Sequence, residues 1–242
     1  MTQPEHTLTI VQLYPDDMNI YGDWGNVLTV MKRAEWHGLS PSLINYNVGD
    51  EFPAEADIII GGGGQDSGQL KVQADLQQIA PRLREFADAD TPMLMICGLY
   101  QLFGRFFKTS KGEIIQGIDI FHAETHGGPE RLIGNIVTTS EEFGEIIGYE
   151  NHSGQTFIDS DMQPLGRVRQ GAGNNGQDDT EGCIYRNVIG TYLHGSLLPK
   201  NPAIADGLIQ EAAKKKYPDF TLNILEDRFA TKAREIALKR PR

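Results

Sequence analysis

The sequence predicts an α/β fold built on a doubly wound, mostly parallel β-sheet flanked by helices. Between residues 8 and 107, short apolar runs suited to buried strands alternate with segments that have helical spacing. Several of these runs end in polar or glycine-rich loops, which is typical of the carboxyl edge of such a sheet, where functional groups gather. From residue 114 onward, short β-rich runs punctuated by glycine predict antiparallel β additions, in the same sheet or as a flanking hairpin layer.

Hydrophobic spacing and stop signals place the individual elements. The first half contains strand-like runs at residues 8–13, 42–46, 56–60 and 93–96. One helix follows Asn26 and stops at Gly38, and a second, around residues 76–86, is expected to kink or restart at Pro81. The second half adds strand-like runs at 132–137, 146–149 and 188–193, followed by helices at 202–216 and 224–239.

Length and composition limit the class of protein. The chain has 242 residues, and we expect a single domain over 1–242 because no linker interrupts the pattern. A mean hydropathy of -0.36 and the absence of a long apolar run predict a soluble protein without a membrane span. Residues 1–6 lack the features of a signal peptide, so we expect a cytoplasmic location. A net charge of -11 argues against nonspecific binding to nucleic acid or anionic membranes.

Cys97 ends the apolar run at 93–96, and the chain then reads as a helix. A strand that turns straight into a helix is the layout of a nucleophile elbow, with the thiol exposed above the sheet edge. The first free amides of the helix would favour the thiolate. The alternative is an ordinary buried cysteine, since cysteine is among the most buried residue types. The second cysteine, Cys183, makes neither a disulfide framework nor a zinc site with Cys97.

Four glycines, Gly61 to Gly64, follow the predicted strand at 56–60. Such a loop allows backbone amides to approach a bound atom closely, and it should lie on the same sheet edge as Cys97. An oxyanion hole is therefore one interpretation. Each amide of such a hole typically stabilises the transition state by about 3 kcal/mol. A tight turn at a strand end is another interpretation. A nucleotide-phosphate loop is disfavoured because the spacing matches neither Gly-x-Gly-x-x-Gly nor a Walker loop.

A thiolate that attacks an amide needs a proton shuttle, and histidine has a suitable pKa at neutral pH. Among six histidines, His194 ends the strand-like run at 188–193 just as Cys97 ends its own. His152 is the alternative base, within a loop-like stretch. The polar loop before residue 180 carries Asp178 and Asp179, for which solvation is favoured over a metal role.

Several runs together resemble the class I glutamine amidotransferase family, in particular its cobyric-acid-synthase-like (CobB/CobQ) branch and, within that branch, the GatD glutaminase subunits of lipid II isoglutaminyl synthases. These runs span nearly the whole chain, and their order and spacing are more specific than any one of them. They are Asn19-Ile-Tyr-Gly-Asp-Trp-Gly-Asn26, Ile60-Gly-Gly-Gly-Gly-Gln-Asp66, Ile96-Cys-Gly-Leu-Tyr-Gln101, Arg131-Leu-Ile-Gly134, Tyr149-Glu-Asn-His152, Gly190-Thr-Tyr-Leu-His-Gly195 and Leu198-Pro-Lys-Asn-Pro202.

The resemblance implies roles for individual residues. Cys97 would be the nucleophile and His194 its partner. The implied oxyanion donors are Gly62 and Gly63 of the glycine loop, together with Gly98, and the implied substrate-binding residues are Arg131 and Gln101. For Arg131, a surface charge beside Glu130 is the alternative. No metal and no cofactor are expected in this chain.

The resemblance also implies a partner. The chain has no nucleotide-binding signature, so ATP and Mg would belong to a separate MurT-like, Mur-ligase-type synthetase. That subunit would use the ammonia to amidate the α-carboxylate of D-glutamate in the lipid II stem peptide, which would bring the pair to the inner face of the membrane. Three alternatives stay open: a corrinoid acceptor, a stand-alone cysteine hydrolase or peptidase, and a catalytically silent binding subunit.

Two positions depart from the family pattern. The elbow usually has glycine two residues after the cysteine, where this chain has Leu99. A glutamate usually follows the histidine by two residues, where this chain has Ser196. A serine hydroxyl cannot neutralise an imidazolium, so we expect either Glu150 or a carboxylate of the partner subunit to reach His194, and we favour the partner.

Overall fold

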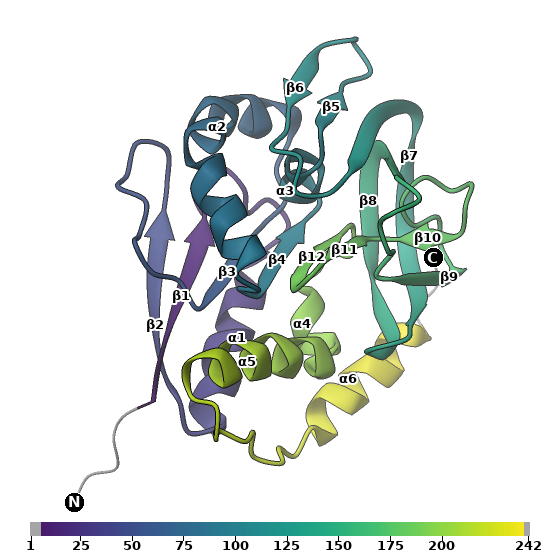
Figure 1. Cartoon of the computed structure of the whole chain (residues 1–242). Coiled ribbons are helices and arrows are strands. Elements are labelled where there is room, and N and C mark those ends of the chain that lie inside the picture. The colour runs from purple at the N-terminus through teal and green to yellow at the C-terminus, as the bar shows by residue number, and fades with distance from the viewer. Residues whose placement is uncertain (1–5, 240–242) are drawn as a thin grey trace, which may run out of the picture.

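The computed structural model describes residues 6–239 (Figure 1). Residues 1–5 and 240–242 lie outside this range, and so does most of the segment that led us to expect no signal peptide. The elements are β1 (Thr7–Leu13), α1 (Trp24–Trp36), β2 (Ser40–Tyr46), β3 (Ile58–Gly61), α2 (Asp66–Asp88), β4 (Met93–Ile96), α3 (Gly98–Phe103), β5 (Phe106–Lys108), β6 (Ile114–Gln116), β7 (Ala123–Ser140), β8 (Gly144–Ile158), β9 (Gly166–Gln170), β10 (Thr180–Glu181), β11 (Cys183–Tyr185), β12 (Val188–Thr191), α4 (Leu197–Lys200), α5 (Pro202–Lys216) and α6 (Arg228–Leu238).

The central sheet has the strand order β11-β12-β4-β3-β1-β2. Its strands are parallel except for β11, which pairs antiparallel with β12. All residues of β3, β4 and β12 are buried, as expected for strands that are covered on both faces. The predicted α/β class with a mostly parallel sheet is therefore confirmed.

The strand order explains where a site can form. The chain moves from β1 to β2 in one direction and from β3 to β4 in the other. Because parallel crossovers are right-handed, α1 and α2 then lie on opposite faces of the sheet. Between β1 and β3 the direction reverses, which is the point in doubly wound sheets where ligands bind beyond the carboxyl ends of the strands. The loop after β1 and the glycine loop after β3 meet there.

A second sheet holds most of the antiparallel strands. Its order is β10-β9-β7-β5-β6, and β8 pairs with β7. The long β7/β8 pair is antiparallel, with a register shift between Gly127 and Leu132, and it stands beside the central sheet in Figure 1. An antiparallel bridge between Tyr149 of β8 and His194, just after β12, links the second sheet to the central sheet. The predicted antiparallel additions thus form mainly a separate layer.

Two helices differ from expectation. Helix α2 runs as one helix from Asp66 to Asp88 with Pro81 inside it, so the helix does not restart there. The C-terminal helix begins at Arg228, four residues later than predicted, and none of its residues is buried. Within residues 6–239, no helix is both long enough and apolar enough to cross a membrane.

Candidate active site

Cys97 lies on the sharp turn between β4 and α3, as the elbow interpretation expected. Its backbone has φ 48° and ψ -98°, a conformation that a non-glycine residue adopts only at a cost of about 1–3 kcal/mol. The surrounding chain holds the turn, because the Cys97 amide donates to the Thr191 carbonyl at 2.8 Å and the Gln101 amide donates to the Cys97 carbonyl at 3.0 Å. Strain of this kind, fixed from both sides, is typical of functional turns.

The structure also accommodates Leu99, the first departure from the family pattern. A Cβ atom on Gly61 would overlap the Leu99 side chain, which therefore occupies the space left by that glycine. Leu99 is fully buried. The elbow keeps its shape because the missing side chain at Gly61 compensates for the larger residue at position 99.

His194 lies next to Cys97. Its amide donates to the Tyr149 carbonyl at 2.8 Å, so the bridge between the two sheets fixes the residue. A Cβ atom on Gly63 would lie 2.8 Å from His194 Cε1 and 3.3 Å from Cys97 Cβ. The imidazole and the thiol thus flank the same glycine, and the ring is 1% exposed. The two strand ends singled out in the sequence meet at one point.

The charge state of His194 depends on its neighbours. Burial disfavours the charged imidazole, but the nearby Cys97 thiolate and the Asp23 carboxylate outweigh burial and raise the pKa of His194 to about 10. At neutral pH the imidazole is therefore mainly protonated, and its positive charge lies beside the Cys97 sulfur. A neighbouring cation is the surrounding that activates a cysteine nucleophile.

Asp23 is a site residue that the sequence analysis missed. Its carboxylate is 2% exposed, and its Oδ1 lies 3.7 Å from His194 Nδ1. Its other oxygen, Oδ2, accepts the Gly63 amide at 2.7 Å. The helix was expected to follow Asn26, but α1 begins at Trp24, and the acid directly before that helix was the available signal.

Ser196 and Glu150 do not orient His194. The Ser196 hydroxyl donates to the Gly22 carbonyl at 2.9 Å. Glu150 is turned to the loop after β9, where its carboxylate accepts the amides of Ala172 and Gly173 at 2.9–3.0 Å. The suggestion that Glu150 supplies the carboxylate for His194 is therefore wrong for this structure, because that carboxylate is committed to backbone amides.

The amides of the Gly61 to Gly64 loop, expected with Gly98 as oxyanion donors, are not equally available. The Gly63 N–H is occupied by Asp23, so in this conformation it cannot also bind an oxyanion. Within residues 6–239 the Gly64 N–H donates no hydrogen bond to the protein, and a Cβ atom on Gly98 would lie only 2.8 Å from that nitrogen. Gly64 lines the same cavity as Cys97. The Gly64 amide is thus better placed to bind an oxyanion than that of Gly63. Gly62 directly precedes Gly63, and neither Gly62 nor Gly98 is among the residues that line this cavity.

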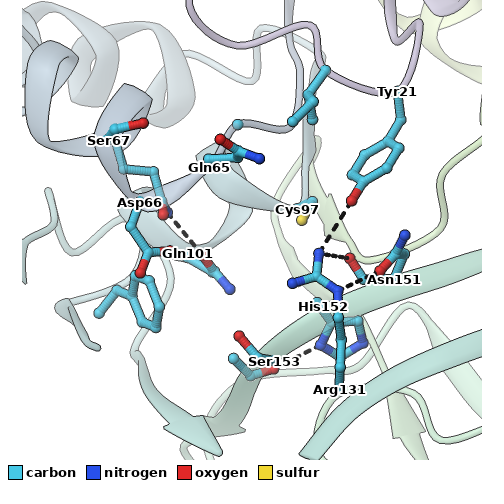
Figure 2. Close-up of a pocket in the computed structure, with 15 residues that line it drawn as sticks. Tyr21, Gln65, Asp66, Ser67, Cys97, Gln101, Arg131, Asn151, His152 and Ser153 are labelled. Atoms are coloured by element: carbon cyan, nitrogen blue, oxygen red, sulfur yellow. Dashed lines mark hydrogen bonds between the residues drawn. The ribbon is translucent and has the colours of Figure 1, made fainter. Parts of the chain in front are cut away.

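A cavity of about 380 Å³ opens in front of the thiol, a size typical of sites for small molecules. Figure 2 shows the Cys97 sulfur facing this space. Arg131 reaches into it from β7, with its Nε donating to Asn151 Oδ1 at 2.6 Å and one Nη donating to the Tyr21 hydroxyl at 3.1 Å (Figure 2). These contacts hold the guanidinium in place, and its other Nη nitrogen donates to none of residues 6–239, so that it can bind a ligand.

Gln101 and His152 also line this cavity. The Gln101 amide group donates to the Tyr192 hydroxyl at 3.0 Å, and its oxygen accepts from Gln69 at 2.8 Å, so the chain already engages both ends. His152 Nδ1 lies 2.6 Å from the Gly154 carbonyl, and its ring stacks on Tyr192 with 3.6 Å between centroids. Burial lowers the pKa of His152 to about 3, which makes it a much weaker base than His194.

Comparison with known proteins identifies the family. The model of the CobB/CobQ-like glutamine amidotransferase domain matches residues 9–202. The chain belongs to the CobB/CobQ-like glutamine amidotransferase family. Cys97 and His194 both lie inside the matched region.

Individual relatives place this amidotransferase more narrowly. It is 36% identical to the lipid II isoglutaminyl synthase (glutamine-hydrolyzing) subunit GatD of Staphylococcus aureus, over 97% of this chain and 96% of that protein. It is 37% identical to the subunit of the same name from Streptococcus pneumoniae, over 92% of this chain and 87% of that protein. A probable cobyric acid synthase of Methanothermobacter thermautotrophicus is 28% identical, over 58% of this chain and 30% of that protein.

Solved structures agree on the fold. A glutamine amidotransferase from Thermotoga maritima superimposes with a TM-score of 0.54 at 13% identity, over 96% of this chain and 94% of that chain. The PurLQS structure from the same organism gives a TM-score of 0.55 at 16% identity, over 86% of this chain and 97% of that chain. At such low identity the likeness concerns the fold alone.

Arg131 is predicted to bind the α-carboxylate of free glutamine in this amidotransferase. We expect Arg131→Ala to raise KM for glutamine about 10- to 100-fold, since a charged hydrogen bond is worth about 1.5–3 kcal/mol. Arg131→Lys should recover little of this affinity, because an ammonium cannot make the same planar contacts. Steady-state kinetics would measure both, with Glu130→Gln as the neighbouring control. An unchanged KM in both arginine variants would favour the surface-charge alternative.

Glu181 supports the strand end that carries His194. It is fully buried, and its Oε1 accepts the Thr191 hydroxyl at 2.9 Å and the Tyr192 amide at 2.8 Å. Burial, opposed by these two hydrogen bonds and assisted by the charge of Glu150, raises the pKa of Glu181 to about 8. At neutral pH the carboxyl is therefore mainly protonated.

This shift predicts a pH-dependent stability. The folded-state pKa of Glu181 lies above its unfolded value of 4.5. Its contribution to the free energy of unfolding is therefore fully present below pH 4.5 and is lost as pH rises through about 8. Glu181→Gln mimics the protonated form and removes this loss. We expect the Tm of the variant, relative to wild type, to rise between roughly pH 5 and pH 9, as measured by differential scanning fluorimetry. The exposed control Glu113→Gln should give a curve of Tm against pH that is parallel to that of wild type. A parallel curve for Glu181→Gln would contradict the prediction.

Proposed function

We propose that this chain is the glutaminase subunit of a two-chain amidotransferase and hydrolyses L-glutamine to glutamate and ammonia. The observation that carries the proposal is the strained Cys97 thiol beside His194, at a cavity into which Arg131 also reaches. A nucleophile and a proton shuttle suit hydrolysis of an amide through a covalent intermediate, and an arginine suits the α-carboxylate of glutamine. The two relatives named as GatD subunits support the same reading.

The geometry supports a covalent mechanism. The Cys97 thiolate attacks the side-chain amide carbon of glutamine, and the resulting oxyanion accepts hydrogen bonds from the Gly98 and Gly64 amides. His194 gives its proton to the departing nitrogen, which leaves as ammonia, and a γ-glutamyl thioester remains on Cys97. His194 then takes a proton from water, whose oxygen attacks the thioester and releases glutamate and the free thiolate.

The ammonia is proposed to pass to a MurT-like synthetase. That subunit would hold ATP and Mg and amidate the α-carboxylate of D-glutamate in lipid II to D-isoglutamine, a step of peptidoglycan biosynthesis. The two relatives are named as the GatD subunit of lipid II isoglutaminyl synthase, which supports a complex of two different subunits. Because lipid II is a membrane lipid, we propose that the complex works in the cytoplasm at the inner face of the membrane.

Copurification followed by product analysis tests this proposal. The tagged full chain is expected to retain a Mur-ligase-type subunit, and the complex should convert lipid II to its amidated form with glutamine and ATP. Amidation of a corrinoid instead would favour the cobyric-acid-type alternative. Hydrolysis of peptides or esters by the chain alone, without glutaminase activity, would favour a stand-alone hydrolase.

A further inference from the structure

The Tyr21 side chain lies between two groups of the active site. Its hydroxyl accepts a hydrogen bond from one Nη nitrogen of Arg131 at 3.1 Å, and its ring packs edge-on against the His194 ring, with 4.5 Å between centroids. Figure 2 shows the Tyr21 hydroxyl directed at the Arg131 guanidinium. Tyr21 is itself among the residues that line the cavity in front of Cys97. No step of the proposed mechanism uses this tyrosine.

The Tyr21 hydroxyl still has its own proton to donate. An arginine side chain can only donate hydrogen bonds, so the tyrosine oxygen is the acceptor in their contact. Among residues 6–239 no acceptor receives the Tyr21 O–H, and the side chain is only half-buried. A hydrogen bond accepted from a cation polarises a hydroxyl and strengthens the next bond that it donates. This proton is therefore available to a ligand in the cavity.

Arg131 has an unused donor beside this hydroxyl. Its Nε donates to Asn151 Oδ1 at 2.6 Å, and the Nη that contacts Tyr21 also donates to the Asn151 carbonyl at 3.3 Å. Asn151 thus occupies the edge of the planar guanidinium formed by Nε and this Nη. The remaining N–H of the same Nη points toward Tyr21 along the edge shared with the second Nη, which donates to none of the described residues. The second Nη and the Tyr21 hydroxyl are therefore neighbouring donors.

The loop that carries Tyr21 is fixed on both sides of this residue. The Ile20 amide donates to the Gly63 carbonyl at 3.1 Å, and the Ser196 hydroxyl donates to the Gly22 carbonyl at 2.9 Å. Gly22 has φ 73°, a backbone conformation that favours glycine. The hydroxyl is thus held in place before a ligand arrives, which lowers the entropy lost on binding.

The charges around the cavity indicate which group of a ligand these two donors take. Of the described side chains that line it, Arg131 is the cation and Asp66 is an anion. His152 is neutral at pH 7, because burial lowers its pKa to about 3. An anionic group is therefore stabilised beside Arg131 and disfavoured near Asp66. Two neighbouring donors, one of them charged, match the two oxygens of a carboxylate.

We propose that Tyr21 binds the substrate and forms, with Arg131, a two-donor clamp for the α-carboxylate of L-glutamine. The second Nη of Arg131 donates to one carboxylate oxygen, and the Tyr21 hydroxyl donates to the other. This inference rests on the proposed glutaminase function and narrows its substrate class to amino acids with a free α-carboxylate. Glutamine whose α-carboxylate is blocked by a peptide bond or an amide offers these donors no charged acceptor and binds weakly.

Tyr21→Phe, made in the full chain and assayed alone and with the synthetase, removes the hydroxyl and keeps the ring on His194. We expect KM for glutamine to rise about 10-fold or more, because a hydrogen bond to a carboxylate is lost, while kcat stays nearly unchanged. L-Glutaminamide, in which an amide replaces the α-carboxylate, is the comparison substrate. Its kcat/KM, measured by chromatography of the isoglutamine formed, should change far less.

Tyr185→Phe is the matched control. The Tyr185 hydroxyl donates to Asp88 at 2.8 Å, and its strand β11 lies at the edge of the central sheet, outside the cavity. KM and kcat of this variant should equal those of wild type for both substrates.

A binding measurement separates this inference from the proposed function. In a Cys97→Ala background, which cannot form the thioester, isothermal titration calorimetry gives the Kd of L-glutamine and of L-glutaminamide. We expect glutamine to bind at least about 10-fold more tightly, since only glutamine supplies a charged acceptor. Adding Tyr21→Phe should remove much of this difference.

Three results would overturn the clamp. One is a loss of kcat at unchanged KM in Tyr21→Phe, because the hydroxyl would then act on the reacting groups. The second is an equal loss of kcat/KM for both substrates. The third is equal affinity of the Cys97→Ala chain for both compounds, which requires no tyrosine variant to fold. Absence of glutamine hydrolysis by wild type would refute the proposed function instead, while the calorimetry would still test the clamp.

Discussion

Cys97→Ala is expected to abolish glutamine hydrolysis while leaving the fold intact. The substitution removes the sulfur that would form the thioester, and no other nucleophile in the described residues occupies the elbow. The side chain is small, so few buried contacts are lost. Ammonia release from glutamine, measured with the purified full chain and with the synthetase complex, should fall to background, and Tm and partner binding should stay close to wild type.

Cys183→Ala provides the matched control. Cys183 is also buried, but it lies on β11 at the edge of the central sheet, and burial raises the pKa of its thiol well above the usual range. Its removal should leave turnover nearly unchanged. Ammonia release at a near wild-type rate by Cys97→Ala would show that the elbow cysteine is not the nucleophile.

His194→Ala is expected to lower kcat for glutamine hydrolysis by about 10²- to 10⁴-fold, the usual contribution of a general acid–base group. Without the imidazole, the thiolate loses the cation that stabilises it and the departing nitrogen loses its proton donor. Steady-state kinetics measures this loss. Added imidazole should restore part of the rate, because the small cavity left by the side chain adjoins the thiol.

His122→Ala is the control for this variant. His122 is 41% exposed, pairs with Asp161 at the surface and lies outside the cavity, so its loss should not change kcat. The prediction fails if His194→Ala keeps wild-type kcat, or if His152→Ala loses more activity than His194→Ala. In the second case, the base would be the histidine that the structure holds neutral.

The sequence by itself determined the fold class and the two reactive strand ends. Apolar runs that terminate at Cys97 and at His194 encode parallel strands locally, and parallel strands place their carboxyl ends on one edge. The same patterning could not separate one sheet from two, because β7 and β8 have the same local signals whether they join the central sheet or stand beside it. The start of α6 was also misplaced, because none of its residues is buried and local spacing alone had to mark where the helix begins.

Only the tertiary structure decided which carboxylate faces the imidazole. Asp23 lies far from His194 in the sequence, and its carboxylate is held by the Gly63 amide, while Ser196 bonds the carbonyl of the preceding residue, Gly22. Glu150 is next to the bridge residue Tyr149, yet the amides of a distant loop hold its carboxylate elsewhere. Local patterns fix strands and turns, whereas the orientation of a buried charge depends on which unpaired polar groups the folded chain brings within reach of it.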